Sequence, residues 1–403
     1  MVFNMTAISK NIKYVGVKDF KIDLFEGQFP VPEGISYNSY IIIDEKIAVM
    51  DSVDRNFGTQ WISNIKSELK GRQPDYLVVH HMEMDHSASI KLFTEEFPNV
   101  KILSSKLAFT IMKNLFDYDF SEKAVTVDEG FFLSLGKHNL QFISAANVHW
   151  PEVIMSFETT EKILFSADAF GTFGAINLQN NFQGDKERNT TTIENWLPEA
   201  RRYYFGIVGK FGNAVQKVLK KLSQFNIKKI CPLHGPLLQK NIDSFISVYK
   251  TWSAYKPESQ GIFIAYTSVY GNTKTAVEKL VDFLRIKTSQ EIIARDISRC
   301  DFSEAIALAF RYDKLVLATT TYANDIFPSM KEFIQHLISR NFQNRKIALI
   351  GNGSWNPVAT KIMSNLLENC ENLTILENPV IIKTGLNQET VENLEKLAEK
   401  LAF

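Results

Sequence analysis

Cysteine is scarce in this chain of 403 residues, which contains three: Cys231, Cys300 and Cys370. They lie far apart and form no C-x-x-C pair, which excludes a rubredoxin-type iron site and the disulfide framework of a small secreted protein. We expect them to be reduced and mostly buried thiols. Cys231 adjoins a candidate ligand loop, but packing is the commoner role for such a residue.

Long apolar runs and an excess of one charge are also missing. No segment approaches the roughly 18 apolar residues that cross a membrane, and residues 1–10 lack the apolar core of a signal peptide. Lysine plus arginine and aspartate plus glutamate each total 45, so we expect neither nucleic acid nor a membrane surface as a partner. The sequence therefore predicts a soluble cytoplasmic protein.

The length of the chain allows two or three domains, and a hydrophobic content of 45% can fill their cores. The segment 251–260, TWSAYKPESQ, is polar and contains a proline. The pattern of apolar and polar residues changes behind it. We therefore predict one domain over residues 1–254 and a second over residues 258–403.

The first domain shows the order of helix, strand and ligand loop that is typical of an α/β sandwich. Apolar runs and alternation predict strands, and a helical repeat of apolar residues predicts helices. The expected strands are 21–25, 39–43, 45–50, 76–79, 101–103 and 139–144, and the expected helices are 59–69, 87–97 and 105–115.

The densest cluster of metal-ligand residue types follows the strand expected at residues 76–79. Within six positions the chain places His81, Glu83, Asp85 and His86. In an extended or turning backbone the first three side chains can point to one side and the fourth can reach a second position, which suits two metals. A hydrated polar loop with satisfied histidines is the alternative, but such a loop has no need of this density.

Three later strand ends carry further candidate ligands. His149 lies in a polar break behind the strand 139–144, Asp168 follows the apolar run 162–166, and His234 follows a third apolar run. A single histidine at a strand end is more often structural, but four of the seven histidines fall at such positions together with three acids. The carboxylate of Glu83 hardens the site and favours iron or manganese over zinc.

Strands and helices alternate behind residue 260. This alternation predicts a doubly wound parallel sheet whose ligand crevice lies at the C-terminal ends of the strands. The expected strands are 261–266, 291–297, 314–319, 346–350 and 379–382, and the expected helices are 273–284, 302–311, 330–340, 359–367 and 388–401.

Three loops at these strand ends are candidate cofactor-binding segments. The loop 267–273 combines hydroxyl groups with a helix N-terminus, which makes an anion seat without a basic residue; a plain Ser/Thr-rich turn is the alternative. It is neither G-x-G-x-x-G nor a Walker motif, so dinucleotides and ATP are disfavoured. The other two loops combine small residues with one aromatic each, which suits a flat heterocycle. The candidate residues are Thr267, Ser268, Val269, Tyr270, Gly271, Asn272, Thr273, Thr320, Thr321, Tyr322, Ala323, Asn324, Gly353, Ser354, Trp355 and Asn356.

The motif H-x-E-x-D-H is similar to the H-x-H-x-D-H loop of the metallo-β-lactamase fold, with Glu83 where a hydrolase usually has its second histidine. Together with the later ligands and the flavodoxin-like second half, it resembles the flavodiiron proteins, also called A-type flavoproteins, over essentially the whole chain. The resemblance implies an α/β fold: an N-terminal metallo-β-lactamase-like αββα sandwich followed by a C-terminal flavodoxin-like doubly wound parallel sheet. It also implies two irons. The first would be held by His81, Glu83 and His149, the second by Asp85, His86 and His234, and Asp168 would bridge them.

The same resemblance implies an oxidoreductase that binds FMN and reduces O2 to water, NO to N2O, or both. The electron donor would be a rubredoxin or another small redox protein, and the chain would form a head-to-tail homodimer or a tetramer. The loops around Thr320 and Trp355 differ in sequence from those usual in the family, which leaves open which aromatic side chain covers the flavin. The alternatives are a metallo-β-lactamase-type zinc hydrolase fused to a flavodoxin electron carrier, and an electron carrier without enzymatic activity.

A few further polar and aromatic residues near these motifs need an interpretation. His80 and His138 match no ligand position, and we expect them to be structural or exposed. Asp51 follows a strand, where turn-forming acids are common. Tyr203 and Tyr204 lie in a segment with apolar residues at helical spacing, which favours packing, although it resembles one that lines the family's pocket.

Overall fold

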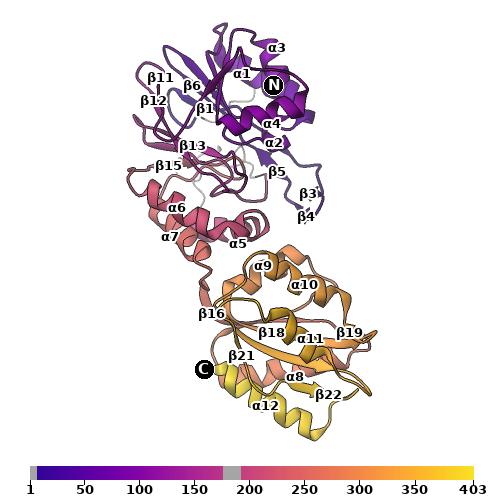
Figure 1. The fold of residues 1–403 in the computed structure, drawn as a ribbon. Helices are drawn as coiled ribbons and strands as arrows, with labels where there is room; N and C mark the ends of the chain where they lie inside the picture. The colour runs from indigo at the N-terminus through magenta and orange to yellow at the C-terminus, as the bar shows by residue number, and fades with distance from the viewer. Residues whose placement is uncertain (1–6, 176–191) are drawn as a thin grey trace. The chain divides into compact units, whose positions relative to one another are not determined.

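A computed structural model of the chain describes residues 7–175 and 192–403 (Figure 1). Residues 1–6, which belong to the segment tested for a signal peptide, and residues 176–191 lie outside them. The chain divides into two compact units, Met1–Tyr249 and Lys250–Phe403. Regular structure is interrupted between Ser253 and Ser259, inside the segment predicted as a linker.

The N-terminal unit is built on two sheets with the strand orders β1-β6-β7-β8-β9-β10 and β11-β12-β13-β14-β15. The strands of the first are β1 (Ile12–Tyr14), β6 (Tyr40–Ile43), β7 (Ile47–Met50), β8 (Tyr76–Val78), β9 (Lys101–Ser104) and β10 (Ala124–Thr126). Those of the second are β11 (Phe132–Ser134), β12 (Asn139–Ser144), β13 (Ile154–Glu158), β14 (Ile163–Phe165) and β15 (Lys229–Cys231). Two small pairs are formed by β2 (Val17–Asp19) with β5 (Ile35–Tyr37) and by β3 (Leu24–Phe25) with β4 (Phe29–Pro30).

The core of this unit lies between the two sheets. Ile42 and Val78 from the first sheet belong to one buried cluster with Phe142 and Phe165 from the second. Each such side chain stabilises the fold by roughly 1.5–3 kcal/mol relative to exposure. This packing is the αββα sandwich that the sequence predicts.

Helices accompany both sheets. In α1, Trp61 and Ile65 repeat at helical spacing and are fully buried, and the helix ends where Lys70 adopts a left-handed backbone. The helical elements are η1 (Arg55–Phe57), α1 (Gly58–Leu69), α2 (Met84–Ser87), α3 (Ile90–Glu96), α4 (Lys106–Phe116), α5 (Ile193–Tyr203), the π-helical turn η3 (Tyr204–Val208), η4 (Gly209–Phe211), α6 (Gly212–Leu222) and α7 (Ile242–Ser253).

Two expectations for this unit were wrong. The strand predicted over 21–25 is reduced to β3, which pairs with β4 in a separate hairpin rather than joining a main sheet. The helix predicted over 87–97 is divided into α2 and α3. Ser87 donates its hydroxyl to the Met82 carbonyl at 2.9 Å, and such side-chain bonds to the backbone compete with a continuous helix. α2 begins at Met84, inside the ligand motif.

The C-terminal unit is a parallel sheet of order β17-β16-β18-β20-β21, in which β22 also pairs with β20. This order is 2-1-3-4-5 in terms of the main strands, the flavodoxin-like arrangement that the sequence predicts. The elements are β16 (Ser259–Tyr266), α8 (Asn272–Lys287), β17 (Glu291–Asp296), α9 (Phe302–Arg311), β18 (Tyr312–Tyr322), β19 (Asp325–Ile326), α10 (Pro328–Ser339), β20 (Lys346–Asn352), α11 (Ala359–Leu367), β21 (Thr374–Ile375), β22 (Val380–Ile382) and α12 (Gln388–Ala402).

One detail of this sheet differs from the prediction. The strand expected over 314–319 continues to Tyr322 and turns back into β19, with which it forms an antiparallel pair. Thr320 and Thr321 therefore lie in a strand rather than in a loop. The sequence lacked the alternation that would have predicted so short a return strand.

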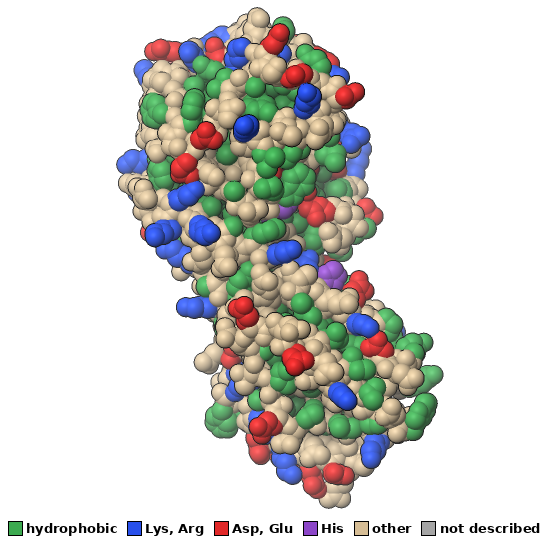
Figure 2. All heavy atoms as spheres, viewed as in Figure 1, with side chains coloured by type: hydrophobic (Ala, Val, Ile, Leu, Met, Phe, Trp, Pro, Cys, Tyr) green, Lys and Arg blue, Asp and Glu red, His purple; other side chains and the backbone are tan. Residues whose placement is uncertain are grey.

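The surface and the helices bear on two further expectations. On the face drawn in Figure 2, acidic and basic side chains are interspersed over each unit, in agreement with their equal numbers. None of the helices formed by residues 7–175 and 192–403 combines the length and the apolar composition needed to cross a membrane. Cys231 is buried, but Cys300 and Cys370 are only half-buried, so the expectation of mostly buried thiols holds for one of the three.

Candidate metal centre and cofactor pocket

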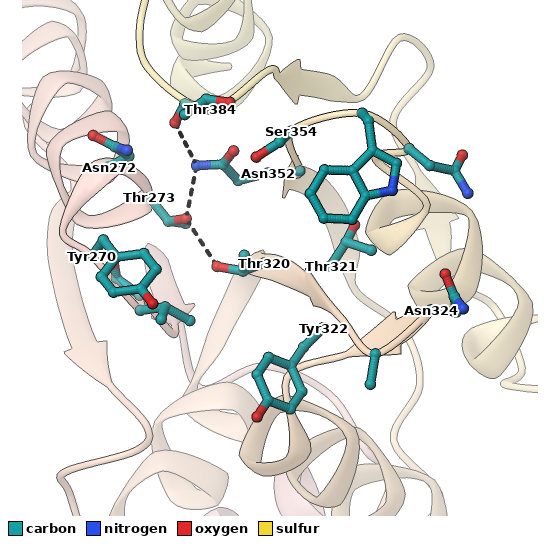
Figure 3. Close-up of a pocket in the computed structure, with 16 residues that line it drawn as sticks. Tyr270, Asn272, Thr273, Thr320, Thr321, Tyr322, Asn324, Asn352, Ser354 and Thr384 are labelled. Carbon is teal, nitrogen blue, oxygen red and sulfur yellow. Dashed lines mark hydrogen bonds between the residues drawn. The ribbon is translucent and has the colours of Figure 1, made fainter.

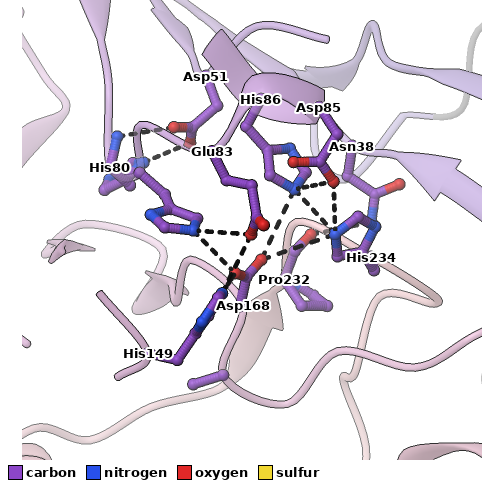
Figure 4. A network of polar contacts seen from close by, with 12 residues as sticks. Asn38, Asp51, His80, Glu83, Asp85, His86, His149, Asp168, Pro232 and His234 are labelled. Atoms are coloured by element: carbon purple, nitrogen blue, oxygen red, sulfur yellow. Dashed lines mark hydrogen bonds and ion pairs between the residues drawn. The ribbon is translucent and has the colours of Figure 1, made fainter. Parts of the chain in front are cut away.

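The seven predicted metal ligands converge on one place in the N-terminal unit (Figure 4). They come from four separate loops, which follow β8, β12, β14 and β15. Strand ends from both sheets meet at this edge of the sandwich, so residues up to 153 positions apart in the sequence are brought together. The side chains form two groups, His81, Glu83, His149 and Asp168 in one, and Asp85, His86 and His234 in the other.

The first group surrounds a small space with four ligand atoms. Glu83 Oε2 lies 3.2 Å from His81 Nε2 and 3.1 Å from His149 Nε2. Asp168 Oδ2 lies 3.3 Å from His81 Nε2 and 3.2 Å from His149 Nε2. Two imidazole nitrogens and two carboxylate oxygens thus face one another at distances that a single cation between them can bridge.

The second group has a similar arrangement. Asp85 Oδ2 lies 3.2 Å from the Nε2 atoms of both His86 and His234, and these two nitrogens are 2.9 Å apart. The Asp85 side chain lies in the same group as His86. From an extended backbone we expected it to point to the same side as His81 and Glu83. The difference arises because α2 begins at Met84 and turns the backbone between Glu83 and Asp85.

Asp168 connects the two groups. Its Oδ2 faces the first group, and its Oδ1 lies 3.6 Å from His86 Nε2 and 3.7 Å from His234 Nε2 in the second. The carboxylate is 1% exposed, and neither of its oxygens receives a hydrogen bond. The same holds for both oxygens of Asp85. Buried anionic oxygens that face only imidazole nitrogens are costly unless a cation balances their charge, so these carboxylates fit metal cations.

The electrostatics of the site point the same way. Burial opposes charge on both kinds of group, yet Asp168 and Glu83 raise the pKa of His149 to about 9. Likewise, His86 and His234 hold the pKa of the Asp85 carboxyl well below its ordinary value despite burial. Without metal the carboxylates are therefore ionised and His149 carries a proton, which a metal cation would replace.

Glu152 supports the first group from behind and was missed by sequence reasoning. Its Oε1 lies 2.7 Å from His81 Nδ1 and accepts a hydrogen bond from the Met82 backbone N–H at 2.9 Å. A carboxylate in this position orients a ligating imidazole and fixes its tautomer. In the sequence, Glu152 is marked only by its position three residues after His149. Acidic residues at such positions are too common to identify a metal site.

The loop that carries His234 is held by the segment before β6. His234 Nδ1 lies 2.8 Å from the Ser36 carbonyl oxygen. Asn38 donates its side-chain amide to the carbonyls of Pro232 and Gly235, both at 2.9 Å. These bonds position the imidazole through the backbone on either side of it.

His80, next to His81, lies outside both groups. Its Nδ1 is 2.5 Å from Asp51 Oδ2, and its Nε2 is 2.8 Å from Ser156 Oγ. All three side chains are buried, and their contacts join the segments behind β7 and β8 to β13. Asp51 is thus more than a turn residue. His138 is likewise buried, against Glu158 at 3.0 Å.

The second candidate site is a cavity of about 480 Å³ at the C-terminal ends of the strands of the other unit (Figure 3). Most predicted cofactor-binding residues line it, but Thr267 and Gly271 do not. Thr267 is buried beneath the cavity, and its hydroxyl forms a hydrogen bond with the Thr319 hydroxyl, the two oxygens being 2.6 Å apart. The lining residues are Ser268, Val269, Tyr270, Asn272, Thr273, Thr320, Thr321, Tyr322, Ala323, Asn324, Asn352, Gly353, Ser354, Trp355, Asn356 and Thr384.

Asn352 and Thr384 belong to this cavity although they were not among the predicted contacts. The Asn352 amide donates to the Thr384 carbonyl at 3.1 Å and lies 3.4 Å from the Thr273 hydroxyl, which ties three loops together (Figure 3). Thr384 follows β22, a strand end that the sequence did not mark with any ligand-like motif. Asn352 could have been found, because it precedes the predicted segment directly.

Large aromatic side chains lie exposed around this cavity. Tyr270 is 93% exposed and Trp355 is 92% exposed, and Tyr322 is 52% exposed. Exposed aromatics cost free energy in water, and around a cavity of this size they fit a planar ring that would cover them. The N-terminus of α8 directly behind Gly271 fits an anionic group.

Comparison with known proteins gives a consistent picture. The family model described as ODP family beta lactamase matches residues 35–235. A nitric oxide reductase of Moorella thermoacetica is 28% identical over 400 residues, which cover 98% of each chain. An anaerobic nitric oxide reductase flavorubredoxin of Vibrio vulnificus is 27% identical over 354 residues, which cover 87% of this chain and 70% of that protein.

Two solved structures match nearly the whole chain. The rubredoxin oxygen:oxidoreductase of Desulfovibrio gigas superposes with a TM-score of 0.90 at 24% identity and covers 99% of this chain and 98% of its own. The flavodiiron protein of Giardia intestinalis also superposes with a TM-score of 0.90, at 25% identity, and covers 100% of this chain and 97% of its own. Both units are therefore included in the match.

Proposed function

The chain belongs to the flavodiiron proteins, and from this premise we propose that it is an oxidoreductase that reduces O2 to water, NO to N2O, or both. The Moorella relative is named a nitric oxide reductase and the Desulfovibrio structure a rubredoxin oxygen:oxidoreductase, which supports both gases as substrates. The same names support a rubredoxin, or another small redox protein, as the electron donor. The reaction takes place in the cytoplasm.

The observation that carries the proposal is the position of Asp168 between the two groups of ligands. One of its oxygens faces His81 and His149, and the other faces His86 and His234. Two metals that share one carboxylate fit this arrangement. One iron would be held by His81, Glu83 and His149, the other by Asp85, His86 and His234, and Asp168 would bridge them.

FMN fits the cavity of the C-terminal unit. When bound, one flavin and two irons allow electrons to be passed singly to a gas molecule. Backbone and hydroxyl groups of residues 268–273 would hold the phosphate, and Tyr270, Tyr322 and Trp355 are the side chains that would pack against the ring. Residues 1–254 act as the di-iron domain, and residues 258–403 act as the FMN domain. The chain forms a head-to-tail homodimer.

Aromatic side chains surround His234 in the second group. The rings of Phe25, Tyr37 and Tyr203 have their centroids 5.2, 6.2 and 5.5 Å from that of His234. This packing buries the His234 imidazole, which is 1% exposed.

A zinc hydrolase fused to an electron carrier is not favoured. Glu83 replaces the imidazole that such a hydrolase would use, and a carboxylate-rich site favours iron over zinc. The relatives named above are reductases.

The proposal is tested by anaerobic stopped-flow measurements. Protein loaded with iron and FMN is reduced, then mixed with O2 or NO in separate experiments, and flavin reoxidation and gas consumption are followed. We expect rapid reoxidation by at least one gas without release of peroxide. Reoxidation by neither gas at more than the rate of free FMN would refute the proposal and favour the electron carrier.

A further inference from the structure

The ligand loop 81–86 serves both groups of the metal centre. Its first half contributes to one group and its second half to the other: His81 with Glu83, and Asp85 with His86. The separation of the two groups therefore depends on how the two ends of this loop are held. Both ends are bound by the same short segment, which directly follows β7.

Asp51 holds the start of the loop. Its Oδ1 accepts a hydrogen bond from the His80 backbone N–H at 2.7 Å, and its Oδ2 lies 2.5 Å from His80 Nδ1 (Figure 4). On the other side, the His80 carbonyl accepts a hydrogen bond from the Ile154 N–H at 3.1 Å, and His80 Nε2 lies 2.8 Å from Ser156 Oγ. The residue before His81 is thus fixed between Asp51 and β13.

Ser52 holds the end of the loop. Its backbone N–H and its hydroxyl both donate to the His86 carbonyl, at 3.1 and 2.8 Å respectively. Among the residues that the structure describes, the Nδ1 atom of His86 has no hydrogen-bond partner. The Nδ1 atoms of His81 and His234, by contrast, each face an oxygen acceptor, which orients a ligating imidazole. The His86 imidazole is therefore positioned through its backbone, which Ser52 fixes.

The backbone of Asp51 allows two neighbouring residues to reach the same loop. In a continuing strand the side chains of Asp51 and Ser52 would point to opposite faces of the sheet. Asp51 instead has φ of 57°, in the left-handed region, which turns the chain directly behind β7. Aspartate tolerates this conformation better than most residues, and such backbone is concentrated at functional sites. The turn is itself held, because the Asp51 carbonyl accepts a hydrogen bond from the Ser39 hydroxyl at 2.9 Å.

We propose that Asp51 and Ser52 are positioning residues that set the separation of the two metals. Both side chains are buried, and each acts through the backbone of the ligand loop rather than on the metals or the gas. This inference rests on the proposed function, in which both metals act on the bound gas. A shift of about 1 Å in reacting groups can cost a large factor in rate, so movement of either end of the loop should slow the reaction.

The test compares Asp51→Ala and Ser52→Ala with two matched controls. Asp75→Ala removes another aspartate between β7 and β8, at their opposite end, where its Oδ2 accepts a hydrogen bond from the first N–H of β7 at 2.8 Å. Ser104→Ala removes another buried serine, whose hydroxyl donates to the Val79 carbonyl at 2.7 Å. All four variants should lower the midpoint of urea unfolding, but only those at Asp51 and Ser52 should change the metal centre.

Two measurements report on the centre without depending on activity. Competition with a chelator gives the affinity for iron, and we expect Asp51→Ala and Ser52→Ala each to hold one of the two irons about tenfold less tightly. The EPR spectrum of the half-reduced pair depends on the coupling of the irons through their shared carboxylate. In excess iron this spectrum should be altered in both variants and unchanged in both controls.

Activity and a conservative variant complete the comparison. Gas reduction by Asp51→Ala and Ser52→Ala in excess iron should fall at least about tenfold, while flavin reduction by the donor stays unchanged. Asp51→Asn should recover most of the iron affinity, the EPR spectrum and the rate. Its amide oxygen still accepts a hydrogen bond from the His80 N–H, and its amide nitrogen can donate to His80 Nδ1.

Parental iron affinity and an unchanged EPR spectrum in Ser52→Ala would overturn the inference, and so would equal changes in Ser104→Ala. If Asp51→Ala does not fold, Ser52→Ala carries the test, because its backbone N–H still binds the His86 carbonyl. A parent chain that binds two coupled irons but consumes neither gas refutes the proposed function instead. The EPR comparison then still decides whether the two residues position the metals.

Discussion

Glu152 Oε1 lies 2.7 Å from Nδ1 of His81, and both side chains are fully buried. The imidazole thus has one nitrogen turned toward the other ligands and the other fixed by a carboxylate. Burial raises the pKa of Glu152, but the hydrogen bond from His81 outweighs it and keeps the carboxyl ionised.

Replacing Glu152 should therefore weaken the first metal. We expect Glu152→Gln to hold this metal about 10–100-fold less tightly, because removal of such an outer partner costs that much in other metal sites. The measurement is the rate of iron loss to a chelator. As a control, Glu158→Gln alters another buried His–Glu pair in the same unit and should leave iron retention unchanged. Equal iron loss in both variants would mean that only general stability is involved.

Asn38 provides a second test, now of the His234 loop. Asn38→Ala leaves two carbonyls, those of Pro232 and Gly235, without their donor and should destabilise the fold by about 1–3 kcal/mol. Asn64→Ala is the matched control, because the side-chain amide of Asn64 also donates to two carbonyls, those of Val15 and Gly16, both at 3.1 Å.

The two asparagine variants should differ in metal content. Both are expected to lower the midpoint of urea unfolding, but only Asn38→Ala should lose the metal held by Asp85, His86 and His234. Retention of two irons per chain in Asn38→Ala would show that the loop keeps its place without this side chain.

The elevated pKa of His149 predicts how the metal-free chain responds to pH. Its folded pKa of about 9 exceeds the unfolded value of 6.5, so the protonated imidazole stabilises the fold fully below pH 6.5. This contribution, at most about 3 kcal/mol, is lost as the pH rises through 9. Urea unfolding of the metal-free chain at pH 6 and pH 10 should show the loss, and His149→Gln should show a smaller one. An equal loss in both chains would contradict the prediction.

Much of this account could be predicted from the sequence, and the exceptions have physical reasons. The ligands His81, His149 and Asp168 follow apolar strands within a few residues, so a local pattern marked each as a candidate, and the family resemblance grouped them. Glu152 acts through hydrogen bonds to His81 and Met82, which are distant in sequence, and no motif marks it. The short strand β19 is set by its pairing with β18 rather than by its own two residues.

The exposure of Trp355 leads to a prediction for the flavin cavity. Because the side chain is 92% exposed, Trp355→Ala should leave the unfolding temperature of the FMN-free chain unchanged. It should weaken FMN binding by about tenfold, since a stacked aromatic pair contributes roughly 0.5–1.5 kcal/mol beyond its buried area. Phe403→Ala removes another exposed aromatic, 94% exposed and outside the cavity, and should bind FMN normally. Fluorescence titration with FMN measures both variants.

The central claim is that two triads of side chains, joined by Asp168, hold two irons. The most direct test is the iron content of the purified chain, reconstituted with excess iron and freed of unbound metal, together with that of His149→Ala and His234→Ala. We predict about two irons per parent chain and about one in each variant, lost from different sites, with FMN retained in all three. Zinc at full occupancy without iron, in protein produced with iron available, or one iron in the parent chain, would contradict the account.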